Sequence, residues 1–351
     1  MLVNQKISNQ IEETNIVREK LQEPSVKAQF QHNAKDAGVL LDYKNKIKNV
    51  RPQPLVVTDA SISEPRENGR IESSFFAVVA APGILSPINF QSLPVMVESL
   101  STNKKIHSRL RDHTMTALEI GMLNLVSKLT CESPFFSVLD GSVIYLGTKF
   151  VQMVNSDDYD FSIEEATELL RTIKETLPLG FVKHTETNFS YKYIEEEIPN
   201  VKDMLYEKEI NEIVLLPGQL LTETSRGIKF NHIKHNVDPD YQRIYMQFMV
   251  LLGEYRTATF KPTDGSEVVR VEFHRSLINE LPKIISSIDF DKKGTVEPFS
   301  QFRSDTYAKH YAEVYEQIWM KEKDPYKSNS GNPIFPVPTR TERHRKQIGG
   351  F

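Results

Sequence analysis

The chain has 351 residues, of which 39% are hydrophobic and 26% are charged, a composition typical of a globular protein with one large domain or two ordinary ones. The formal net charge is −4, so binding of nucleic acid would have to depend on local basic patches and not on overall basicity. No apolar stretch approaches the roughly 18 residues of a membrane span, and the N-terminus lacks an apolar signal-peptide core. The lone Cys131 excludes an internal disulfide. We therefore expect a cytoplasmic protein with no membrane contact.

The first half of the chain alternates between helical and extended patterns. Residues 1–48 are polar with a loose apolar stripe, which predicts an N-terminal helical arm. Strands are expected over 54–59 and 71–82, and the favoured turn dipeptide Asn68-Gly69 precedes the second. Residues 104–130 carry apolar side chains at steps of three and four, which predicts a long helix.

The second half begins with an apolar run over 135–146, which predicts a buried strand. Ser162 and Glu165 form a Ser-x-x-Glu capping box for a helix over 162–176, which Pro178 ends. The remaining expected elements are a short strand at 180–184, strands within 244–260 and 268–273, and helices at 276–288 and 305–320.

This order of elements predicts an α/β fold in three parts. We expect an arm over 1–48, a body over 49–320 and a flexible basic tail over 321–351, which is rich in Pro, Asn and Ser before its last stretch. That last stretch, TRTERHRKQIGGF, is either a solvated tail or a patch for nucleic acid. The apolar segment IVLLPGQLL (213–221) is either a contact surface for a partner or part of the core.

Three carboxylates fall on separate elements of the body. Asp59 ends the first strand, Glu119 lies within the long helix, and Asp140 interrupts an apolar run. Carboxylate oxygens are hard ligands that suit Mg²⁺ or Mn²⁺, and a buried carboxylate needs a compensating partner. Each also has a plain structural explanation: an Asx-turn for Asp59, a solvated helix position for Glu119, and a hairpin start for Asp140, which Gly141 follows.

The motifs VVTDAS (56–61) and SVLDGSVIYL (137–146) resemble those of the NurA family of DNA-end-processing nucleases, whose fold is similar to RNase H and the Piwi domain. The family usually has Asp-Gly-Ser at the end of the first strand, whereas Ala60 takes the glycine position here. RVEFHRSL (270–277) is similar to the family's late strand, and the resemblance runs from about residue 50 to 318. It implies an RNase H-like (Piwi-like) mixed sheet flanked by helices.

The resemblance also implies roles for particular residues. Asp59, Glu119 and Asp140 would hold one or two Mn²⁺ or Mg²⁺ ions, and Lys183 in FVKHTET would contact a phosphate. In FRSDTYAKHYAEV, His310 would complete the metal shell or carry a proton; eight residues earlier, Phe302 replaces the family's usual tyrosine. Tyr307 and Tyr311 are candidates to supply the missing tyrosine hydroxyl. The alternative to a functional role is a half-buried helix position for His310 and a surface position for Lys183.

The implied function is a metal-dependent deoxyribonuclease that acts on single strands and duplex ends, as a 5′-to-3′ exonuclease plus endonuclease. Family members work as homodimers on a HerA-type hexameric DNA-translocating ATPase, in DNA end resection, repair or phage defence. The chain itself has no Walker A motif, so a partner would hydrolyse ATP. Two other readings remain: a catalytically silent scaffold for the ATPase, motivated by Ala60 and Phe302, and an enzyme acting on RNA or hybrids.

Overall fold

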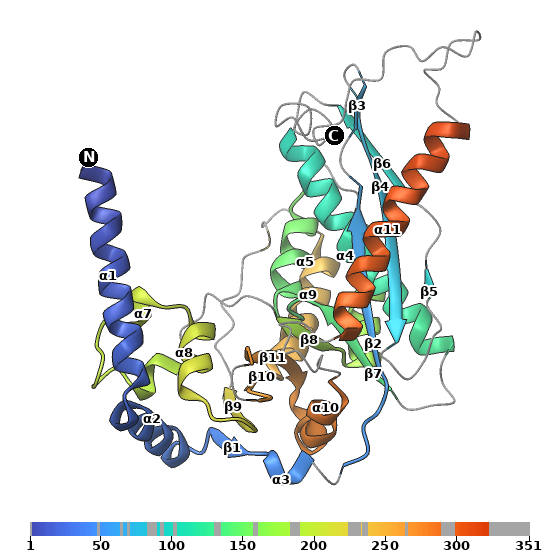
Figure 1. Ribbon diagram of the computed structural model, residues 1–351. Coiled ribbons are helices and arrows are strands. Elements are labelled where there is room, and N and C mark those ends of the chain that lie inside the picture. The colour runs from blue at the N-terminus through green and yellow to red at the C-terminus, as the bar shows by residue number, and fades with distance from the viewer. Residues whose placement is uncertain are drawn as a thin grey trace.

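The computed structural model of the chain is shown in Figure 1. The residues it describes are 2–47, 50–63, 66–68, 71–82, 90–91, 95–100, 104–129, 135–156, 161–182, 190–223, 233, 238–263, 266–288 and 299–322. The predicted tail after residue 322 and Cys131 therefore lie outside the described residues.

Five strands form the centre of the sheet in the order β6-β4-β2-β7-β8. Their bounds are Leu55–Ile62 for β2, Ile71–Pro82 for β4, Val95–Leu100 for β6, Phe136–Asp140 for β7 and Leu179–Val182 for β8. β4 is antiparallel to both β2 and β6, whereas β2, β7 and β8 are mutually parallel. This order and these directions are those of an RNase H-like sheet, which confirms the predicted mixed sheet.

Further strands extend the sheet on both sides. Beyond β8, four strands follow, each antiparallel to its neighbour: β11 (Val269–His274), β10 (Tyr255–Phe260), β9 (Gln219–Glu223) and β1 (Leu40–Asp42). On the other side, β4 also pairs with β3 (Arg66–Asn68) and β5 (Phe90–Gln91). β3 and β4 pair antiparallel, with Asn68 opposite Ile71, so Asn68 belongs to a strand and not to the predicted Asn68-Gly69 turn. The turn residues themselves, 69–70, lie outside the described residues.

Helices cover both faces of this sheet (Figure 1). The helices among the described residues are α1 (Leu2–Gln22), α2 (Pro24–Asp36), α3 (Lys44–Ile47), α4 (Lys104–Leu129), α5 (Leu146–Val154), α6 (Ile163–Thr176), α7 (Val201–Met204), α8 (Glu207–Val214), α9 (Pro239–Gly253), α10 (Leu281–Ser287) and α11 (Phe299–Glu322). Short 3₁₀ turns lie at Ser190–Tyr193 and Arg275–Glu280. None of the described helices is long and apolar enough to cross a bilayer.

The two long helices α4 and α11 lie on opposite faces of β2 and β4. Met122 of α4 packs in a cluster with Val78 and Ala80, whereas Ala308 of α11 packs against Val79. Because successive strand residues point to opposite faces, these contacts place the two helices on either side of the sheet. The centre of the sheet is therefore enclosed, and side chains from α4 and α11 both approach the ends of its parallel strands.

The N-terminal helices α1 and α2 lie at the side of the molecule away from α11 (Figure 1). Leu21 and Phe30 pack in one core cluster with Ile210 and Val214 of α8 and with Leu221 of β9. Val214, Leu215 and Leu221 of the segment IVLLPGQLL belong to that cluster and Leu220 belongs to a second one, so the segment is part of the core. Leu216 is its exposed exception.

The capping box predicted for residues 162–176 is present. The Ser162 hydroxyl accepts a hydrogen bond from the Glu165 N–H at 3.1 Å, and the Glu165 carboxylate accepts one from the Ser162 N–H at 2.8 Å. These bonds satisfy two amide groups that have no acceptor within the helix. α6 ends at Thr176, and Leu177 takes a left-handed conformation (φ 41°) just before Pro178.

Three sequence predictions were wrong in detail. The strand expected over 135–146 ends at Asp140, and α5 begins at Leu146. The strand expected from residue 244 is helical as far as Gly253, because Asp238 caps α9 and the buried side chains of this apolar run repeat with a helical period. The helix expected over 305–320 begins six residues earlier, at Phe299.

Candidate active site

Asp59 and Asp140 lie where two parallel strands part. Pairing between β2 and β7 ends at Thr58 and Leu139, and the two aspartates are the next residue on each strand. β7 ends there, but β2 continues to Ile62, so the expectation that Asp59 ends its strand was wrong. The alternative explanation of Asp140 as a hairpin start was wrong, since α5 and not a strand follows it. Crevices at the carboxyl ends of parallel strands are the usual place for ligands in such sheets.

Glu119 reaches the same place from α4. Its Oε1 accepts a hydrogen bond from the backbone N–H of Ala60 at 3.3 Å, and its side chain is half-buried. Burial raises the pKa of Glu119 to about 8, against the opposing positive charge of Lys149, and the neighbouring negative charge of Asp140 adds to the rise. Glu119 and Asp140 are therefore close enough to disfavour simultaneous ionisation.

Asp140 has a partner that sequence reasoning missed. Nε2 of Gln301, in the first turn of α11, donates a hydrogen bond to Oδ1 of Asp140. Gln301 is 1% exposed, whereas the next residue, Phe302, is 56% exposed and faces away from the site. The position that aligns with the family's tyrosine thus points to solvent. The helix was expected to begin only at residue 305, so Gln301 was not assigned to it.

A basic side chain that sequence reasoning did not propose interacts with one of these carboxylates. Lys149 on α5 interacts electrostatically with Glu119 and also with His113, a buried residue of α4 whose pKa is lowered chiefly by burial. Lys183 follows β8 directly but lies outside the described residues. Lys149 was missed because the apolar run before it was predicted to be a strand through residue 146, and the start of α5 was not recognised.

His310 is exposed on α11, with its ring 5.7 Å from the ring of Tyr311. Ala308 and Ala312 are the buried alanines of this stretch, and Tyr307 and Tyr311 pack, partly buried, against the cluster that Ala308 forms with Val79 of β4. Over the described part of the chain, no three His, Cys, Asp or Glu side chains are grouped closely enough to hold a metal ion. The arrangement thus brings Asp59, Glu119 and Asp140 to one corner of the sheet without gathering them around a common point, and leaves His310 on the surface.

The chemistry of this corner suits a divalent cation. Carboxylates are the preferred ligands of Mg²⁺ and Mn²⁺. The raised pKa of Glu119 is the behaviour of a carboxylate that lies beside Asp140 and is partly shielded from water. A cation bound between the two would favour their ionised forms and so relieve this cost. The residues present therefore fit the group that the sequence motifs imply.

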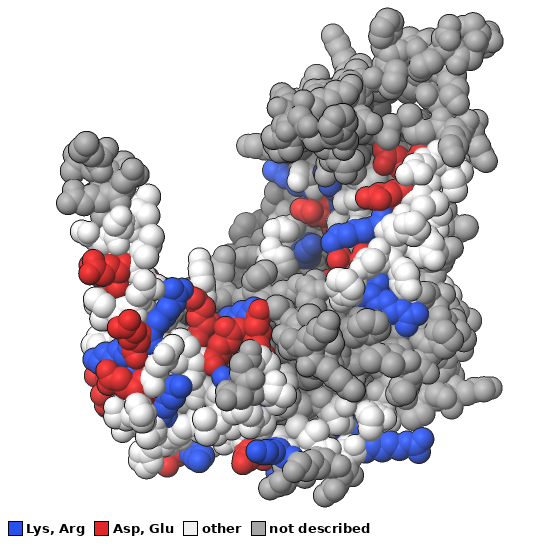
Figure 2. Space-filling model, in the orientation of Figure 1, with Lys and Arg blue, Asp and Glu red and all other residues white. Residues whose placement is uncertain are grey.

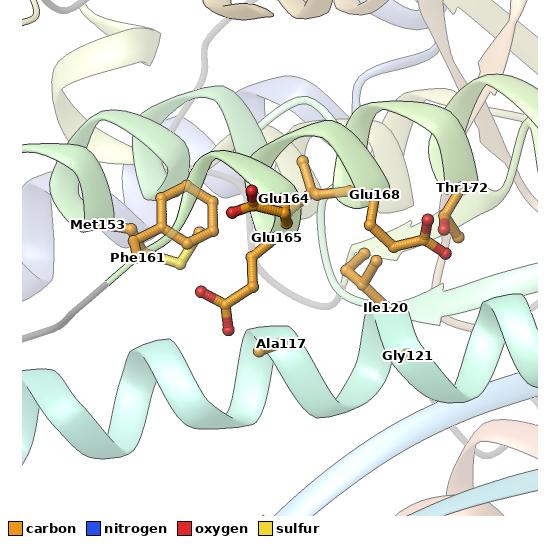
Figure 3. Close-up of a pocket in the computed structure, with 10 residues that line it drawn as sticks. Ala117, Ile120, Gly121, Met153, Phe161, Glu164, Glu165, Glu168 and Thr172 are labelled. Carbon is orange, nitrogen blue, oxygen red and sulfur yellow. The ribbon is translucent and has the colours of Figure 1, made fainter. Parts of the chain in front are cut away.

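A pocket of about 420 Å³ lies between α4 and α6 (Figure 3). Ala117 and Gly121 line it from α4, two residues to either side of Glu119. At about 100° per residue this places Glu119 on the opposite side of the helix, so the pocket is separate from the carboxylate corner. Two of its glutamates already have structural partners, since Glu165 completes the capping box and Glu168 binds Arg171.

No protein-family model and no curated protein matches the sequence. Among solved structures, the crystal structure of the NurA nuclease from Sulfolobus solfataricus is similar with a TM-score of 0.54 and 13% identity, covering 91% of this chain and 96% of that one. A second crystal structure of NurA gives a TM-score of 0.52 and 10% identity, covering 78% and 89% of the two chains. The chain therefore has the fold of the NurA structures.

Proposed function

We propose that this chain is a divalent-metal-dependent deoxyribonuclease. The observation that carries the proposal is the placement of Asp59, Asp140 and Glu119 at the corner where β2 and β7 part, with the pKa of Glu119 raised to about 8. Perturbed carboxylates at such a crevice are typical of functional sites. The NurA fold and the motifs VVTDAS and SVLDGSVIYL support the choice of DNA as substrate.

In this proposal Asp59, Glu119 and Asp140 hold one or two Mn²⁺ or Mg²⁺ ions. Such an ion, when bound, supplies an activated water and support for the leaving 3′ oxygen of a phosphodiester. Gln301 orients Asp140 through its hydrogen bond, and Ala60 holds the Glu119 carboxylate through its N–H. Lys149 offers a positive charge beside Glu119, where it would help to neutralise a phosphate.

Lys183 and His310 stay predictions in their assigned roles. Lys183 would contact a phosphate next to the end of β8. His310 would become a ligand or a proton carrier only after a rearrangement, because its side chain is exposed on α11. The division into arm, body and tail and the cytoplasmic location also stay predictions.

We further propose that the chain works as a homodimer with a HerA-type hexameric ATPase, in end resection, repair or phage defence, digesting 5′ to 3′ with an added endonuclease activity. Acidic and basic side chains are interspersed on the face seen in Figure 2, and the net charge is −4. Both observations support an enzyme to which a partner delivers DNA, since neither favours unaided capture of a polyanion.

A catalytically silent scaffold for the ATPase is the second candidate. The exposed His310 and Phe302 favour it, as does the lack of a close group of three potential ligands in the described part of the chain. It predicts binding to the motor without cleavage of DNA. An enzyme acting on RNA or hybrids is separated from both by substrate competition.

The test is cleavage of linear single- and double-stranded DNA, labelled at either the 5′ or the 3′ end. Wild-type chain is incubated with Mn²⁺ or with a chelator, alone and with a HerA-type ATPase. Cleavage that requires Mn²⁺ is expected, and the labelled end that is released first gives the polarity. A folded, ATPase-bound chain that cuts neither substrate would favour the scaffold.

A further inference from the structure

A buried carboxylate two strands away from Asp140 contacts the turn that follows it. Glu272 lies on β11 and is 2% exposed. It pairs with Gly180 of β8, which in turn pairs with Leu139 of β7. The Glu272 side chain therefore has to cross β8 to reach the turn.

Gly180 leaves room for this crossing. A Cβ atom at this position would lie 2.7 Å from the carbonyl oxygen of Gly141 and 3.2 Å from Oε2 of Glu272. The first distance is shorter than real Cβ contacts allow, so any side chain at residue 180 would displace the turn. The turn and the Glu272 carboxylate are thus packed directly on a bare stretch of β8.

Glu272 satisfies the polar groups of the turn. The Ser142 hydroxyl lies 2.9 Å from each of its carboxylate oxygens, and the N–H of Ile144 donates to Oε2 at 3.0 Å. Ser142 then accepts a hydrogen bond from the N–H of Tyr145 at 3.1 Å, which ties the turn to the start of α5. A hydrogen bond from the Gly141 N–H to Phe181 at 3.0 Å holds the other side.

The charge of Glu272 is balanced within the fold. Burial raises its pKa, whereas the N–H of Ile144, the Arg270 guanidinium and the Ser142 hydroxyl oppose that rise. Arg270 lies two residues earlier on β11, on the same face of the sheet, with Nη1 3.9 Å from Oε2 of the buried Glu207. A buried carboxylate with this many donors belongs to a defined network and not to an incidental contact.

We propose that Glu272 is a positioning residue that fixes the turn 141–144 and so sets the direction of the Asp140 carboxylate for metal binding. The proposal rests on the metal-dependent function proposed above. Glu272 itself does not touch the substrate or the metal. It acts through Ser142 and Ile144, and because the same turn leads into α5, it also places Lys149.

The test compares Glu272→Gln with Glu316→Gln in the full-length chain. Glutamine keeps the size of the side chain but turns an NH₂ group toward donors of the turn. Glu316 is also a buried carboxylate, 7% exposed, and it lies near the end of α11. Three quantities are measured: Mn²⁺ affinity by calorimetry, amide hydrogen exchange over residues 141–145, and thermal unfolding with chelator present.

Glu272→Gln is expected to weaken Mn²⁺ binding by roughly 10- to 100-fold, the usual range for residues that orient a metal ligand, and to speed exchange in the turn. Glu316→Gln is expected to lower thermal stability while keeping Mn²⁺ affinity within about twofold of wild type, since it does not support a ligand. Ser142→Ala should give a smaller loss in the same direction as Glu272→Gln.

Two results would overturn the proposal alone: wild-type Mn²⁺ affinity in Glu272→Gln, or an equal loss of affinity in both glutamine variants. A wild-type chain that binds no Mn²⁺ would overturn the proposed function as well. The wild-type titration therefore tells the two failures apart.

Discussion

Gln301 donates a hydrogen bond to Oδ1 of Asp140, so the first turn of α11 is joined to the last residue of β7. The two residues are 161 positions apart in the sequence. This contact makes α11 part of the candidate site through its first turn, whereas His310, more than two turns later, is exposed.

Replacing Gln301 with methionine should weaken metal binding. Methionine keeps the length of the side chain but lacks the N–H donor, so the Asp140 carboxylate loses a group that orients it. The Mn²⁺ concentration for half-maximal cleavage should rise about 10-fold. The matched control is Phe302→Ala on the exposed side of the same turn, which should change it less than about twofold. Equal effects in the two variants would show that Gln301 has no special role.

Glu119 should make the metal-free protein less stable as the pH rises. Its pKa is about 8 in the folded state, above the value of 4.5 for an unperturbed glutamate, so the folded state holds the extra proton between these values. The contribution of this group to the free energy of unfolding is fully present below about pH 4.5 and is lost as the pH rises through about 8.

This dependence is measured by urea unfolding between pH 5 and pH 9 with chelator present. Glutamine cannot ionise, so the stability of Glu119→Gln relative to wild type should increase over this window. A constant difference between the two proteins would contradict the raised pKa of Glu119.

Removing the charge of Lys149 should shift the pH profile of cleavage. The Lys149 ammonium opposes the rise in the pKa of Glu119, so Lys149→Ala should raise that pKa further and move the acidic limb of the profile to higher pH. Lys149→Arg should restore the limb, because it keeps the charge. Lys174→Ala, an exposed change on α6, is the control and should leave the profile in place. An unshifted profile in Lys149→Ala would separate Lys149 from the site.

Two glycines should respond oppositely to alanine. In Gly180→Ala the new Cβ meets the Gly141 carbonyl, so the free energy of unfolding should fall by about 1–3 kcal/mol and cleavage should fall with it. In Gly121→Ala the new Cβ meets nothing within 4 Å on a helix, so stability should rise by up to about 1 kcal/mol. Chemical denaturation measures both. A tolerated Gly180→Ala would mean that the turn after Asp140 can move freely.

Local patterns predicted much of this fold because the responsible interactions are short-range. The capping box of α6 is a contact between Ser162 and Glu165, and both are visible in one turn of sequence. Strands β2, β4 and β7 are dense in apolar residues between turn signals. The apolar run of α9 was assigned wrongly because a buried helix and a buried strand can share the same composition.

The site was only partly predictable because its supporting contacts are long-range. Asp59, Glu119 and Asp140 could be proposed from residue type and motif. Gln301 and Glu272 could not, since their partners lie 161 and 130 residues away and neither has a distinctive local pattern. Only the order of strands, which places β11 next to β8 and β8 next to β7, brings Glu272 to the turn after Asp140.

The most direct test of the metal-dependent nuclease is the rate of cleavage of end-labelled linear DNA by Asp140→Asn, at saturating Mn²⁺ and under conditions where the wild type cuts. Asp305→Asn, which removes an aspartate that pairs with Lys309 on α11, is the matched control. We predict that Asp140→Asn loses more than roughly 100-fold in rate, beyond the loss expected for a residue that only orients a ligand, while Asp305→Asn cuts as the wild type does. Cleavage at the wild-type rate by Asp140→Asn would contradict the assignment of the active site to this corner of the sheet.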